Sequence, residues 1–156
     1  MSDALSAFVK RWRFKGPPYA TSRDLIAELR RVTPAEHQEL IDDLLLNITF
    51  FDDRAVKAEA RKRPDGKYDV DLVVLAKKTR ADSAGNETDM PLDATLDVGV
   101  QDANGKFLAL EKKRVKSGEN RFALVVDGEP AKAGIDPLNK MIDRDTSDNM
   151  TEVSRQ

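Results

Sequence analysis

The chain has 156 residues, 40% of them apolar and 35% charged, which suits one folded domain with room for a small addition. Its 26 Lys and Arg nearly balance 28 Asp and Glu, which argues against a nucleic-acid binder held by overall charge. With no Cys and one His, the chain lacks the parts for disulfides, thiol catalysis and two-His or Cys-ligated zinc sites, so we expect no catalysis from it alone.

Residues 1–50 are predicted to be helical, because apolar residues recur there at intervals of three and four. The first such stripe consists of Leu5, Phe8, Val9 and Trp12. A glycine and two prolines at 16–18 are predicted to end this helix, since proline lacks the N–H that a continuing helix needs.

Two further helix starts carry capping signals. Thr21 and Asp24 have the spacing of a capping box. Thr33 is predicted to cap a third helix, with Pro34 at its first position. The apolar face of this third helix is predicted to consist of Leu40, Ile41, Leu44, Leu45 and Ile48.

After Phe51 the hydrophobic period falls to two, which predicts strands. We expect them near 54–62, 67–78, 87–100, 106–116 and 119–127, with a weaker pair near 130–135 and 149–154. Short strands separated by turns, without helices between them, are typical of a sandwich. Residues 51–156 are therefore predicted to form an antiparallel, immunoglobulin-like β-sandwich of about seven strands. Its predicted core includes Leu72, Val74, Val98, Phe122 and Leu124.

Two patterns are compared with metal-binding motifs, and each departs from its template. His37 has no second His to complete H-E-x-x-H, so it is predicted to be a solvated helix residue. Asp143, Asp145 and Asp148 resemble part of a calcium loop, but an Asp and a Ser stand where an EF-hand needs Gly and Glu. We expect a solvated acidic loop here and leave cation binding open. The pair Asp52–Asp53 is likewise interpreted as surface acids.

Two basic clusters each admit two interpretations. Residues 10–15 interleave four cations with Trp12 and Phe14, which suits nucleic acid or a membrane surface. Cations at a helix C-terminus also complement its dipole, and the lysines of residues 112–116 could protect a strand edge from pairing. We favour these structural roles. No stretch approaches the roughly 20 apolar residues of a membrane span, so we expect a soluble chain with no membrane insertion. Because the charges nearly cancel and the basic clusters have structural interpretations, we also expect no nucleic-acid partner.

A family resemblance rests on the run FVKRWRFKGPPYATSRDLIAELRRVTPAEHQELIDDLLLNITFFDDRAVKAEA. It resembles the region after the catalytic helices of bacterial aminopeptidase N-like zinc metallopeptidases, in the branch fused to ABC-type permease segments. The helices up to Thr21–Leu25 look like the end of the family's thermolysin-like domain, and ITFFDDRAVKAEA looks like the start of its β-sandwich. The C-terminal end of that branch is similar to three later segments of this chain, PDGKYDVDL, LDVGVQDANGK and AGIDPLNKMIDR. The resemblance therefore covers nearly the whole chain.

The family's zinc helix, H-E-x-x-H with a further Glu, and its G-x-M-E-N substrate segment are absent. The resemblance therefore places no catalytic or metal residue on this chain. It implies a C-terminal region, in which 1–50 is the end of the missing catalytic domain with a connector and 51–156 is the β-sandwich. Zinc would be bound by the parent's catalytic domain, and the parent would lie at the bacterial inner membrane.

The leading functional hypothesis is a non-catalytic accessory domain that braces the catalytic domain of a membrane-associated zinc metallopeptidase. Leu5, Phe8, Val9 and Trp12 form the candidate interface with that domain, and in its absence this helix is expected to self-associate or fray. The alternative is a free-standing β-sandwich module that binds protein or polysaccharide. A hydrolase that uses Asp or Glu pairs is the third hypothesis.

Overall fold

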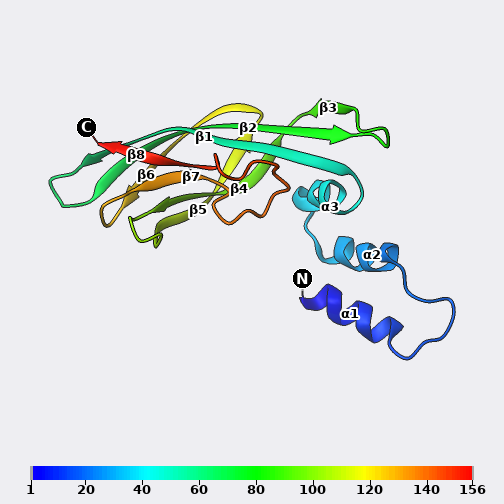
Figure 1. Ribbon diagram of the computed structural model, residues 1–156. Helices are drawn as coiled ribbons and strands as arrows, with labels where there is room; N and C mark the ends of the chain where they lie inside the picture. The colour runs from blue at the N-terminus through cyan, green and yellow to red at the C-terminus, as the bar shows by residue number, and fades with distance from the viewer. Residues whose placement is uncertain (1, 156) are drawn as a thin grey trace. The chain divides into compact units, whose positions relative to one another are not determined.

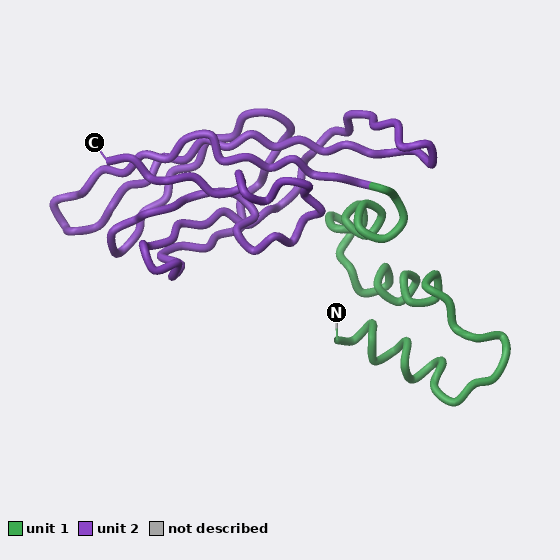
Figure 2. The backbone as a smooth tube through the Cα atoms, in the orientation of Figure 1, with its two compact units in different colours: residues 1–48 green, residues 49–156 purple. Residues whose placement is uncertain are grey.

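The computed structural model describes residues 2–155, and the chain divides into two compact units (Figure 2). Unit 1 comprises residues 1–48 and is helical, whereas unit 2 comprises residues 49–156 and is built from strands. Each unit is described by itself.

Unit 1 contains the three predicted helices, which are α1 (Ser2–Trp12), α2 (Ser22–Val32) and α3 (Gln38–Leu45) (Figure 1). The predicted capping box is confirmed, because both the backbone N–H and the hydroxyl of Thr21 donate to the carboxylate of Asp24, at 2.9 and 2.7 Å. α1 packs against α2, and an ion pair between Arg11 and Glu28 at 3.6 Å joins the two helices.

The predicted cap of the third helix is wrong. The N–H and hydroxyl of Thr33 both donate back to the carbonyl of Leu29, at 3.1 and 2.8 Å, so Thr33 ends α2. A single 3₁₀ turn at Ala35–His37 follows, and α3 begins at Gln38. Few residues separate the two helices, so Thr33 lies close to both helix ends. Its hydroxyl donates to the last turn of α2 and therefore does not cap the helix that follows. The predicted apolar face of α3 is only partly covered, since Ile41 is buried and Leu45 is exposed.

Unit 2 consists of eight strands in one hydrogen-bonded sheet. They are β1 (Ile48–Lys62), β2 (Tyr68–Ala81), β3 (Glu87–Met90), β4 (Asp93–Gln101), β5 (Phe107–Lys116), β6 (Gly118–Val126), β7 (Lys132–Ile135) and β8 (Met150–Arg155). The order along the sheet is β3-β2-β1-β8-β7-β4-β5, and β6 pairs with β2 (Figure 1). The strand predictions are confirmed in the main, with two corrections. The run at 87–100 is divided into β3 and β4, and β1 begins at Ile48, so that Ile48 lies on a strand and not on the apolar face of the third helix.

The sheet is mixed and strongly curled, a half-barrel and not a clear sandwich. It departs from the predicted antiparallel arrangement at β8, which runs parallel to β1 and antiparallel to β7. β8 therefore joins the strands β3, β2 and β1 to the strands β7, β4 and β5 in one sheet. Alternation in the sequence shows which residues face inward, but it carries no information on which strands are neighbours or on their direction.

The core of unit 2 consists of the inward-facing side chains of this curled sheet. The predicted core residues Leu72, Val74, Val98 and Leu124 are buried. Phe122 is only partly buried, so that prediction is wrong in degree, although the ring still packs against the core. Phe122 lies on β6, which among the described pairings has a partner, β2, on one side alone, so its ring has no neighbouring strand on the other side.

We predict that Gly134→Ala severely destabilises unit 2. A Cβ at Gly134 would lie 1.9 Å from the carbonyl oxygen of Asn149 and 2.8 Å from Cα of Met150, so β7 and β8 would have to separate. Overpacking of this kind costs about 3 kcal/mol or more when backbone must move. Urea unfolding measures the loss. Gly16→Ala is the control, because that position has open space. A loss below about 1 kcal/mol for Gly134→Ala would contradict the packing described here.

Candidate functional site

The stripe of α1 is the candidate interface that the sequence singles out. Within it, Leu5 is 45% and Val9 is 54% exposed, whereas Phe8 and Trp12 are half-buried. The buried residue of α1 is Ala4. The stripe is thus only partly covered, and its two aliphatic members remain in contact with solvent.

The basic cluster at the end of α1 surrounds Trp12. Arg11 and Lys15 place their cationic groups 5.7 and 5.8 Å from the centre of the Trp12 ring, a cation–π geometry. Arg11 also pairs with Glu28. Phe14, just beyond the helix, is 99% exposed. Arg11 and Lys15 therefore have partners in unit 1, and Lys10 and Arg11 lie in the last turn of α1, where cations complement the helix dipole. The expected inward packing of the aromatic residues is wrong for Phe14.

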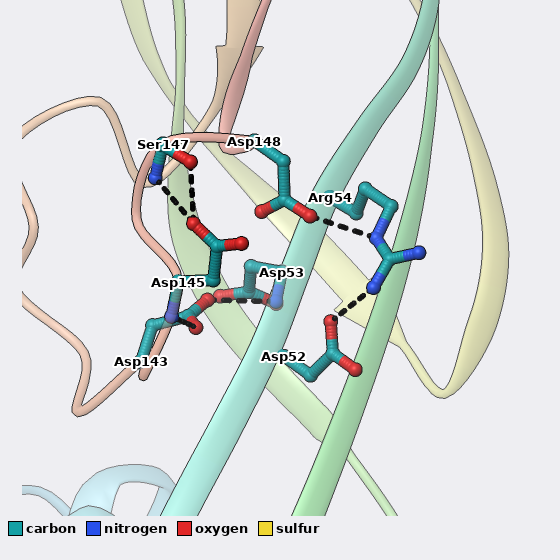
Figure 3. Close-up of polar contacts among 7 residues, drawn as sticks. All are labelled: Asp52, Asp53, Arg54, Asp143, Asp145, Ser147 and Asp148. Carbon is teal, nitrogen blue, oxygen red and sulfur yellow. Dashed lines mark hydrogen bonds and ion pairs between the residues drawn. The ribbon is translucent and has the colours of Figure 1, made fainter.

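A second candidate site lies where β1 meets residues 136–149, which we call the connection because they join β7 to β8. Alternate backbone N–H groups of β1 donate to it. Phe51 donates to the carbonyl of Ile142 at 2.9 Å, and Ala55 donates to the carbonyl of Asp148 at 2.8 Å. Between them, Asp53 donates to Oδ2 of Asp143 at 2.9 Å (Figure 3). The Asp143 carboxylate thus occupies the place of a strand carbonyl.

Two buried polar residues fix the ends of the connection. The side-chain nitrogen of Asn149, in the orientation that its partners require, donates to the carbonyl of Asp53 and to Oδ2 of Asp143 at 3.3 Å. At the other end, the carboxylate of Asp136 accepts the N–H groups of Lys140 and Met141 at 3.0 and 2.8 Å. Both Asn149 and Asp136 are almost fully buried.

The outer carboxylates of this site are bound differently. Asp145 is exposed and accepts from the backbone and hydroxyl of Ser147, whose hydroxyl first of all lowers the pKa of Asp145. Arg54 pairs with Asp148 at 2.9 Å and Asp52 at 3.4 Å (Figure 3). The acidic run 143–148 is thus partly solvated, as predicted, but two of its acids attach it to β1. Within residues 2–155 no group of three or more His, Asp or Glu side chains is placed to hold a metal ion.

Asp53 is the residue of this site that the sequence interpretation missed. It is 0% exposed, and neither carboxylate oxygen has a hydrogen-bond partner within the described part of the chain. Burial raises its pKa to about 7, and the charges of Asp143, Asp136 and Asp52 add to that rise. Its interpretation as a surface acid is wrong. The alternation of β1 offered the signal, because Asp53 shares the inward face with Phe51 and Ala55.

This chain lacks the His and Cys side chains that would bind the zinc implied by the resemblance. His37 is the single His of the chain and is exposed, and there is no Cys. Of the helices in residues 2–155, none is long and apolar enough to cross a membrane.

Comparison with known proteins finds no counterpart. No protein-family model, no curated protein and no solved structure matches this chain. The resemblance to zinc metallopeptidases therefore stays a prediction.

We predict that Asn149→Ala destabilises unit 2 by about 2 kcal/mol, because it removes a buried donor shared by Asp53 and Asp143. Chemical unfolding followed by circular dichroism measures this loss. Asn104→Ala is a matched control at an exposed turn and should change stability by less than about 0.5 kcal/mol. Equal effects from the two variants would show that Asn149 does not hold the connection.

Proposed function

We propose that this chain is a non-catalytic accessory domain of an aminopeptidase-like zinc metallopeptidase, and that α1 packs against the catalytic domain of that enzyme. The observation that carries the proposal is the exposure of Leu5 and Val9 on a helix whose stripe has the pattern of a core face. Because each side chain is about half exposed, completing its burial would contribute about 1 kcal/mol, roughly half the value for a fully exposed side chain. That gain favours a protein partner over solvent.

The resemblance implies that the partner of the α1 stripe is the catalytic domain. In the proposed parent, α1 would be the last helix of the thermolysin-like domain, so its apolar side would pack on that domain's preceding helices. Unit 2 would stand where the family has its immunoglobulin-like sandwich, and its curled sheet would brace the catalytic domain. The zinc and the catalytic residues would belong to the catalytic domain alone.

We predict that replacing both exposed aliphatic residues, in Leu5→Glu/Val9→Glu, weakens association of the chain about tenfold or more, because it puts charge into an apolar contact. Sedimentation measures self-association, and titration calorimetry measures binding to an H-E-x-x-H catalytic domain encoded in the same reading frame. Ser2→Glu/Ser6→Glu adds the same charge to exposed positions of α1 and should leave binding unchanged. A wild type that neither self-associates nor has such a catalytic domain would overturn the proposal in favour of a free-standing module.

We predict that the chain by itself retains no stoichiometric zinc after dialysis and hydrolyses no aminoacyl amide, because one His cannot build the family's site. Elemental analysis and a fluorogenic aminopeptidase assay measure the two properties. One zinc per chain, or turnover that His37→Ala abolishes, would place catalysis in this chain and contradict the accessory role.

A further inference from the structure

The buried carboxyl group of Asp53 occupies a site that does not accommodate a negative charge. It projects from the inward face of β1 into the interior of unit 2, where both of its oxygens lack hydrogen-bond donors among residues 2–155. An ionised carboxylate in such a place is costly, because burial removes its hydration and no donor among residues 2–155 replaces it. The structure therefore accommodates this side chain as a neutral acid.

The charged groups that act on Asp53 are carboxylates. Asp143 and Asp136 act from the connection, and Asp52 acts from β1 itself. Arg54, the cation of the same strand segment, is paired with Asp52 and Asp148 (Figure 3). Burial first of all, and then the charges of these three carboxylates, raise the pKa of Asp53 to about 7.

Asp143, the first of these neighbours, is also the group that attaches the connection at this point. Its Oδ2 accepts the backbone N–H of Asp53. The Asp143 carboxylate is thus hydrogen-bonded to the backbone of Asp53 and interacts electrostatically with the side chain of the same residue. When the Asp53 side chain is neutral, the hydrogen bond is unopposed. When it is ionised, two carboxylates repel each other across this attachment.

We propose that Asp53 is a proton-operated latch, which holds the connection on the edge of β1 when its carboxyl group is protonated and releases the connection when that group ionises. The closed arrangement is the one described here. Opening would carry Asp143, which is only half-buried, towards solvent and would free the N–H groups of Phe51, Asp53 and Ala55. The latch rests on these contacts and is independent of the proposed accessory role.

The sign of the pH dependence follows from the two forms of Asp53. Its pKa is about 7 when the latch is closed, and an Asp exposed by opening returns towards the ordinary value of 3.8. The closed form therefore binds the proton more tightly and is favoured at low pH. As the pH rises between these two values, the equilibrium constant for opening increases about tenfold per pH unit, and it levels off above about pH 7.

Amide hydrogen exchange of the full chain tests the latch. We expect protection of the Phe51, Asp53 and Ala55 amides, corrected for the intrinsic pH dependence of exchange, to fall about tenfold or more between about pH 5 and about pH 8. Asp53→Asn is neutral at every pH and should keep its protection throughout. Asp127→Asn, which changes an exposed acid that is not among the groups acting on Asp53, should behave like the wild type. Protection in the wild type that does not change with pH would overturn the proposal.

A direct measurement needs no variant. The ¹³C chemical shift of the Asp53 carboxyl carbon should titrate with a midpoint near 7, and a midpoint below about 5 would overturn the latch. Both experiments are run with EDTA and repeated with calcium chloride. If calcium alone restores protection at about pH 8, a cation and not a proton neutralises this site, and the proposal is wrong.

Discussion

Three backbone N–H groups on one edge of β1 need acceptors, and the arrangement of unit 2 depends on how they are supplied. A buried strand edge without acceptors would be costly, because each unpaired N–H loses its bond to water. The connection supplies the carbonyls of Ile142 and Asp148 and, between them, the carboxylate of Asp143. Farther along the same strand, β8 takes over as partner of Ala58–Ala60. The long irregular connection thus serves as a substitute strand.

The change of partner coincides with a change in the phase of β1. Its buried positions alternate through Asp53 and Ala55, and then resume at Ala58 and Ala60, one residue out of step. An extra residue in a strand bends it and increases its twist, as β-bulges do. The curl of the sheet is consistent with this offset, which lets the two halves of β1 face the same core while they pair with different segments.

How far the sequence predicts this structure differs between its parts. The capping box of Thr21 and Asp24 was predictable because it depends on neighbours three residues apart, and the strands were predictable from their period of two. The role of Thr33 was not, since its hydroxyl had two helix ends within reach. The parallel pairing of β8 depends on contacts between distant segments, which alternation does not encode. The inward face of β1 was predictable from alternation, but Asp53 was not assigned to it, because an Asp is ordinarily expected at the surface.

The direction of β8 has a consequence for synthesis on the ribosome. β1 is the first strand of unit 2 to leave the exit tunnel and β8 is the last, yet Ala58 and Val153 are partners in the finished sheet. Closing so long a loop carries a large entropic cost and makes folding slow. Until β8 has been synthesised, the nascent chain must therefore keep the β1 edge without its final partner, and during that interval it is open to pairing with other chains.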